Sequence, residues 1–151
     1  MNITYAPDGI LQIDDAKICF RNFSGNPGQY NREGDRNFAV VIPNDEIANE
    51  LTDRGWNVTV KPPREEGEDY FRYLKIKVKF NDHGPTIYLK TNGVQNKLDE
   101  DTVHILDNID ILSVDLDIRP YHWSVNGDSG QSAYLQTVRV TQKVDRFAGD
   151  D

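Results

Sequence analysis

The feature that most constrains this chain is a strict two-residue alternation between residues 70 and 80. Leu74, Ile76 and Val78 fall on one side, whereas rings and lysines fall on the other. This period is typical of a β-strand with one buried face. A turn over 81–84 and a second strand over 85–91 should follow, paired with the first. The outward side chains of this predicted hairpin are Phe71, Tyr73, Lys75, Lys77, Lys79, Tyr88 and Lys90.

The remaining pattern is also mainly β. The sequence predicts strands over 10–20, 36–42, 56–60, 112–118 and 133–141, the last two forming a long C-terminal hairpin turned at Asn126-Gly127. One short helix is predicted over 44–54, and a second over 99–107 is left open. About seven strands with one or two helices favour a small antiparallel barrel. An immunoglobulin-like sandwich is the structural alternative.

Size and composition narrow the class further. The chain has 151 residues, enough for one domain over 1–143, and it ends in a short acidic tail over 144–151. Cys19 is the only cysteine, so intramolecular disulfides and multi-cysteine metal sites are excluded. The sequence shows no secretory leader and no apolar run of about 18 residues, so we expect a cytoplasmic protein without a membrane segment.

Motifs for catalysis are scarce. The three histidines, His83, His104 and His122, are too far apart for a common metal-binding spacing. Asp115 and Asp117 share one strand face and form the only carboxylate pair suited to a metal-dependent nuclease, although a solvated face explains them equally well. We therefore predict no enzyme, no metal and no cofactor, and rank a magnesium-dependent nuclease last.

Charge is distributed very unevenly. The net charge is −8, yet residues 70–97 hold six basic side chains and one acid, a local +5 that leaves −13 for the rest. Aromatic rings beside cations on one β face can stack bases and neutralise phosphates. A lysine-rich face that only prevents edge aggregation is the alternative.

Two further clusters mix rings with arginines. The first lies in and beside the glycine-rich loop 21–34, and the second lies near the tip of the C-terminal hairpin. Rings that merely complete the core, or that close one end of a barrel, are the alternatives. The candidate residues of these clusters are Arg21, Phe23, Tyr30, Arg32, Arg36, Arg119, Tyr121 and Trp123.

Four segments together resemble a known family: 21–25 (RNFSG), 31–38 (NREGDRNF), 63–67 (PREEG) and 118–127 (IRPYHWSVNG). The sequence is similar to single-stranded-DNA-binding proteins of the OB-fold type that tailed bacteriophages encode. The resemblance implies an OB-fold-like barrel, a non-catalytic role in phage DNA replication or recombination, and action in the cytoplasm of the infected host cell. It also implies that an acidic tail, here Phe147, Asp150 and Asp151, recruits replication or recombination proteins.

The leading hypothesis is therefore sequence-tolerant binding of single-stranded DNA by the candidate residues above. The alternative is an acidic structural or protein-interaction domain, such as a virion component or an inhibitor of a host enzyme. Whether the chain forms a homodimer is left open, because a free sheet edge or the last hairpin could pair with a second copy.

Overall fold

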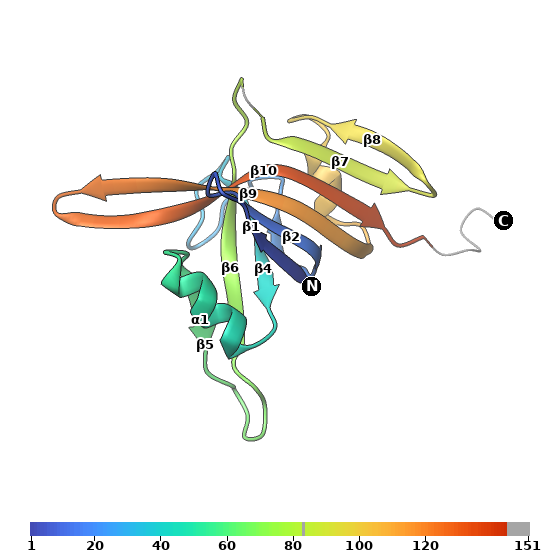
Figure 1. Ribbon diagram of the computed structural model, residues 1–151. Coiled ribbons are helices and arrows are strands. Elements are labelled where there is room, and N and C mark those ends of the chain that lie inside the picture. Colours follow the sequence, from blue (N-terminus) through green and yellow to red (C-terminus); the bar gives the residue numbers. More distant parts are fainter. Residues whose placement is uncertain (83, 145–151) are drawn as a thin grey trace.

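The computed structural model describes residues 1–82 and 84–144 as one ten-stranded sheet, one α-helix and one 3-10 helix (Figure 1). No helix in these ranges is long and apolar enough to cross a membrane. The elements are β1 (Asn2–Tyr5), β2 (Leu11–Ala16), β3 (Ile18–Asn22), β4 (Arg36–Ile42), α1 (Asp45–Asp53), β5 (Val58–Lys61), β6 (Phe71–Val78), β7 (Thr86–Thr91), β8 (Val94–Leu98), η1 (Val103–Asp107), β9 (Ile111–Val125) and β10 (Asp128–Gln142).

Strand β10 connects the two parts of the sheet. The main strand order is β1-β2-β9-β10-β6-β4-β3, with β5 beside β6 and with β7 between β10 and β8. Along its length β10 pairs antiparallel with β9 and parallel with β7, and it meets β6 in parallel where Tyr134 lies opposite Lys77. The prediction of a mainly β, OB-like domain with a short helix and a long C-terminal hairpin is confirmed. The sheet is mixed and not closed, rather than purely antiparallel.

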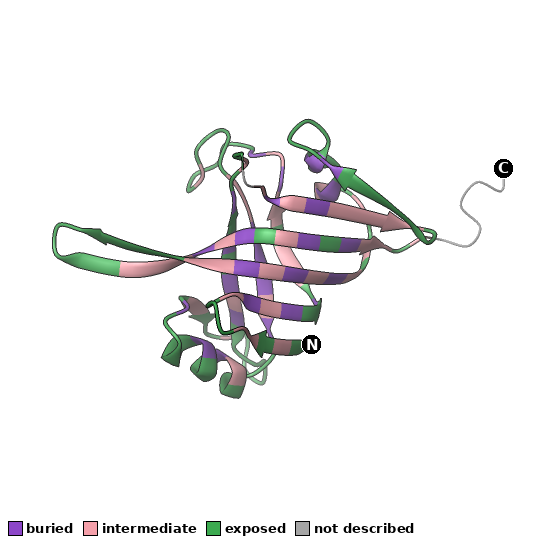
Figure 2. Ribbon diagram, turned by 45° about the horizontal axis from the view of Figure 1, so that its top comes forward, coloured by how far each residue is buried: buried purple, intermediate pink, exposed green. Residues whose placement is uncertain are grey.

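The core follows from the alternation in the central strands. Leu74, Ile76 and Val78 of β6 are buried as predicted, and β9 and β10 bury alternate residues in the same way (Figure 2). The apolar alternation of the predicted strand over 112–118 also placed Leu112 on the inward face, but Leu112 is 66% exposed near the start of β9. Burial of apolar surface stabilises the folded state by about 25 cal/mol per Å². A shift of one residue would expose this whole apolar face, so burial of the face fixes the register of the strands.

The predicted pairing of segment 85–91 with segment 70–80 is wrong. Both edges of β6 are already occupied, one by β4 and the other by β5 and β10. Strand β7 therefore pairs with β10 over Thr86–Lys90 and with β8 on its other side. Strands β1 and β8 were not predicted, and the second helix is only the 3-10 turn η1.

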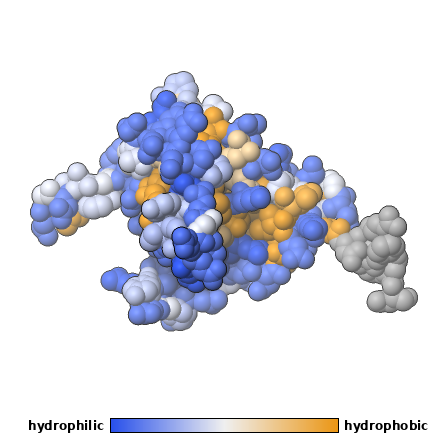
Figure 3. All heavy atoms as spheres, turned by 90° about the horizontal axis from the view of Figure 1, so that it is seen from below, coloured by the Kyte–Doolittle hydropathy of each residue, from blue (hydrophilic) through white to orange (hydrophobic). Residues whose placement is uncertain are grey.

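The outer half of the β9–β10 hairpin projects from the body as an arm (Figure 1). Its turn is the predicted Asn126-Gly127 pair, with φ of 51° and 85°, the left-handed conformations that such a two-residue turn requires. Residues 121–129 are all exposed. Seen from below, most of the arm has an intermediate hydropathy, with hydrophilic and hydrophobic atoms at its tip (Figure 3).

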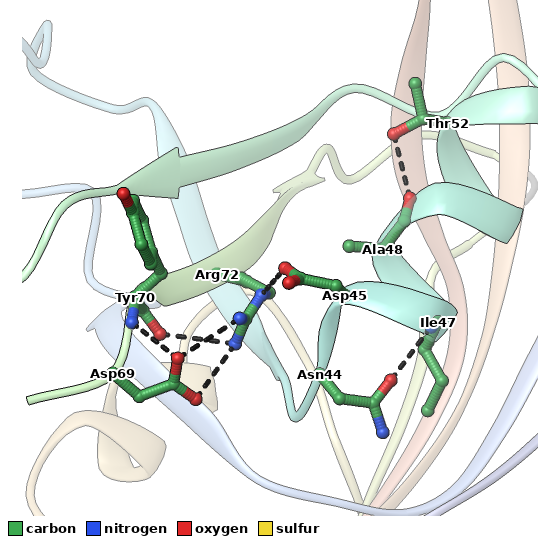
Figure 4. A network of polar contacts seen from close by, with 8 residues as sticks. All are labelled: Asn44, Asp45, Ile47, Ala48, Thr52, Asp69, Tyr70 and Arg72. Atoms are coloured by element: carbon green, nitrogen blue, oxygen red, sulfur yellow. Dashed lines mark hydrogen bonds and ion pairs between the residues drawn. The ribbon is translucent and has the colours of Figure 1, made fainter.

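A polar network fixes the start of β6 against α1 (Figure 4). The Asn44 side chain caps α1 by accepting a hydrogen bond from the Ile47 N–H at 2.9 Å. The Arg72 side chain, only 5% exposed, places Nε 2.6 Å from Asp45 Oδ1 and Nη2 3.3 Å from Asp69 Oδ1. The hydrogen bond that Arg72 donates to Asp69 lowers the pKa of that carboxyl group, and a hydrogen bond from the Tyr70 N–H lowers it further. Strand β6 is thus fixed near its first residues by the contacts of Arg72.

Candidate nucleic-acid interface

The outward face of β6 carries the predicted rings and cations. Phe71, Lys75, Lys77 and Lys79 are exposed and Tyr73 is half-buried, while the residues between them are buried. Because each inward side chain is fixed in the core, the outward ones are held in a row along a rigid strand.

This row forms one wall of a groove of about 840 Å³. Tyr73, Lys75 and Lys77 line it from β6, and the arm supplies Tyr121 and Trp123 from the other side. The predicted β6 cluster and the predicted arm cluster therefore meet in space. Tyr134 of β10, which belongs to neither predicted cluster, lines the same groove.

Tyr134 was not predicted as a site residue, and two cations and a second ring surround it. Lys77 Nζ lies 5.8 Å and Arg119 Cζ 5.0 Å from its ring centroid, and the Tyr121 ring lies 5.8 Å away, almost perpendicular to it. Both cations are within cation–π range. The signal in the sequence was the two-residue alternation, because the apolar neighbours Ala133 and Leu135 are buried and Tyr134 therefore lies on the outward side of β10.

Two smaller hollows extend this groove. One, of about 510 Å³, shares Lys75, Lys77 and Tyr134 with it and adds Tyr30 of the glycine-rich loop, Arg36 at the start of β4, and the acids Asp35 and Glu100. The other, of about 400 Å³, is lined by Lys79 and Arg119. We call the three together the basic groove. The hollows are linked by shared lining residues: Lys75, Lys77 and Tyr134 line the first two, and Lys79 lines the second and the third.

The loop cluster is only partly available to a ligand. Tyr30 is 90% exposed and Arg32 is exposed, as a binding role requires. Arg36 is largely buried, and its guanidinium donates to the Phe23 carbonyl at 2.6 Å and lies 5.5 Å from the Phe80 ring centroid.

Two predicted contacts of this loop are structural instead. Phe23 is completely buried and stacks on Phe38 with ring centroids 5.0 Å apart, so the expectation that it stacks on bases is wrong. Arg21 donates to the carbonyls of Leu106 and Ile109 at 2.8 and 2.7 Å, which ties β3 to η1. Here the alternative weighed from the sequence, a packed loop that completes the core, describes the structure.

Tyr88 and Lys90 do not join the lysines of β6. They lie on β7, which pairs with β10 and β8 and has no register with β6. Tyr88 lines a separate hollow with Asp14, Asp115 and Asp117. The predicted tail contacts Phe147, Asp150 and Asp151 lie outside the described residues.

The carboxylate pair of β9 has structural partners. Asp115 accepts hydrogen bonds from the Asp15 N–H at 2.9 Å and from Arg139 at 2.7 Å, and these lower its pKa. Burial, together with the charges of Asp14 and Asp8, raises the pKa of Asp117. Among residues 1–82 and 84–144, no three His, Cys, Asp or Glu side chains gather in a way that could hold a metal ion.

A small OB-like β domain with a basic, ring-lined groove is a typical nucleic-acid-binding architecture. Residues 2–149 match the family described as "Putative phage ssDNA-binding domain". The chain belongs to this family, as the resemblance in the sequence indicated.

Solved structures share the fold at low sequence identity. Two of them are structures of the single-stranded DNA-binding protein from bacteriophage Enc34. Its C-terminal truncation aligns with a TM-score of 0.59 and 12% identity over 95% of this chain and 91% of that one. Its complex with single-stranded DNA aligns with a TM-score of 0.58 and 14% identity over 97% and 93%. No curated protein matches the sequence.

Proposed function

We propose that this protein binds single-stranded DNA in the basic groove without sequence preference. Bases stack on Tyr73, Tyr121, Trp123 and Tyr134, and phosphates lie against the lysines of β6 and Arg119. Ring faces accept any base, and cations read only the backbone, so this chemistry tolerates any sequence. The family to which the chain belongs and the solved DNA complex of a protein with the same fold support this assignment.

The observation that carries the proposal is that separate clusters converge. Lys75 and Lys77 of β6 and Tyr134 of β10 line both the main groove and the hollow beneath the glycine-rich loop. A solvated lysine face would need no wall of aromatic side chains opposite it. The arm supplies such a wall.

We further propose a non-catalytic role in phage DNA replication or recombination, in which the protein coats displaced strands in the cytoplasm of the host cell. Recruitment of replication proteins through the tail residues Phe147, Asp150 and Asp151 remains a prediction. The family assignment and the basic groove support the DNA-coating part of this role.

The test is a fluorescence-anisotropy titration of a labelled poly-dT strand of about 30 nucleotides at low and high salt, with a duplex of the same length as control. We expect tight binding to the single strand that weakens as salt rises and that largely spares the duplex. Absence of binding at low salt would refute the proposal and favour the acidic interaction domain, for which a pull-down of protein partners is the next experiment.

A further inference from the structure

Phe20 has an unusual backbone and an unusual exposure. It lies in β3, at an irregularity in the pairing with β4 between Cys19 and Asn22. Its φ is 51°, in the left-handed region that a bulky residue rarely adopts, and its side chain is 58% exposed. Bulges of this kind redirect a side chain, and a strained residue persists where the surrounding structure enforces it.

The Phe20 ring points toward β6. Its centroid lies 5.3 Å from that of Tyr73 and 5.9 Å from that of Phe71, with interplanar angles of 77° and 85°. Strand β4 separates β3 from β6, so the Phe20 side chain reaches over β4. Ala39 lies in β4 between Cys19 and Lys75 in register and, though small, is only 2% exposed. We call these three rings the Phe20 cluster.

The Phe20 cluster continues the basic groove. Tyr73 belongs to both, since it also lines the groove beside Lys75. Lys61 Nζ lies 5.7 Å from the Tyr73 ring centroid, so cations flank the rings on β5 and on β6. Beyond Phe71 the chain becomes acidic, with Glu65, Glu66, Glu68 and Asp69 in the loop before β6. This change of charge favours a phosphate chain as far as the cluster and disfavours it beyond the cluster.

We propose that the Phe20 cluster is the terminal base-stacking site of the groove, where an unpaired base of the bound strand contacts Phe20. This inference rests on the proposed function. Phe20 packs edge-on against its two neighbours, and its ring and that of Phe71 remain exposed to solvent, so a planar ligand can reach them. The flanking lysines favour a nucleotide over an uncharged apolar segment.

The test compares Phe20→Ala, Phe20→Leu and Phe20→Tyr in the poly-dT titration. Leu112→Ala, which truncates another exposed apolar side chain outside the groove linings, is the matched control. We expect Phe20→Ala to weaken binding about 5- to 150-fold, the range that the loss of one stacked base gives. Phe20→Leu should lose most of the same affinity because it lacks a ring, and Phe20→Tyr should keep it. Leu112→Ala should bind as the wild type does.

Wild-type affinity of Phe20→Ala or of Phe20→Leu would overturn the inference while leaving the proposed function intact. If the wild-type protein itself does not bind, the proposed function fails instead. Sedimentation of each variant without DNA tests whether the Phe20 cluster contacts a second copy of the chain instead of a base. If Phe20→Ala changes the oligomeric state of the DNA-free protein, the cluster contacts a second copy and the inference is wrong. Should the alanine variant not fold, the leucine and tyrosine variants decide the question.

Discussion

Replacing Lys75 and Lys77 with alanine tests whether the groove lysines contact phosphates. Each phosphate contact with a single strand contributes about 0.7 to the slope of log K against log salt concentration. Because both lysines line two parts of the groove, we assign one contact to each. The double variant should therefore lower the slope by about 1.4. At about 0.1 M salt, relative to 1 M, this amounts to roughly 25-fold weaker binding, or about 1.9 kcal/mol.

The chain offers a matched control in Lys90→Ala with Lys97→Ala. This pair also removes two positive charges, but it lies on β7 and β8 and lines none of the hollows that form the basic groove. Anisotropy titrations of both double variants at four or more salt concentrations, on the order of 0.05 to 0.5 M, give the slopes. An equal loss of slope in the two variants would mean that net charge, and not the groove, determines binding. An unchanged slope for the Lys75/Lys77 variant would refute the phosphate contacts.

Two further predictions concern the arm and the acidic face. A Cβ at Gly130 would lie 2.6 Å from the Trp123 ring, so Gly130→Ala should displace that ring. We expect altered tryptophan emission and weaker DNA binding. Unchanged emission and affinity would contradict this prediction. Asp117→Asn should raise the melting temperature at pH 7, because the raised pKa of Asp117 means that its charged form destabilises the folded state. The wild-type protein recovers that stability on protonation, so the difference should vanish as the pH falls below 3.8, the ordinary pKa; a difference that persists there would exclude this cause.

Local patterns in the sequence predicted the local structure well. The alternation in β6 placed its lysines outward, and Asn126-Gly127 placed the turn of the arm. Asn44 caps the helix at the predicted start. In each case the information lies within a few residues, because strand period, turn conformation and helix capping are all short-range effects.

Pairings between distant segments could not be predicted in the same way. Tyr88 was assigned to the β6 face because its strand follows β6 in the chain, yet the partners already on β6 leave no edge for it. Phe23 looked like a loop ring beside arginines, and only the position of Phe38 shows that it completes the core. Tyr134 became a site residue through its register with Lys77, which connects segments 57 positions apart.

Strand β10 changes partners along its length, from β6 at Tyr134 to β7 from Thr137 onward. This change explains how an acidic chain can present a basic groove. Along β9, Asp115 and Asp117 pair with the part of β10 that borders β7, whereas Arg119 pairs with Tyr134, where β10 meets β6. Tyr121 and Trp123 follow on the arm and line the groove. Strand β9 thus presents acids where β10 borders β7, and a cation followed by rings where β10 borders β6. The net charge of −8 is an average over both regions, so the position at which β10 changes partners, and not the total charge, determines which surface can hold a phosphate chain.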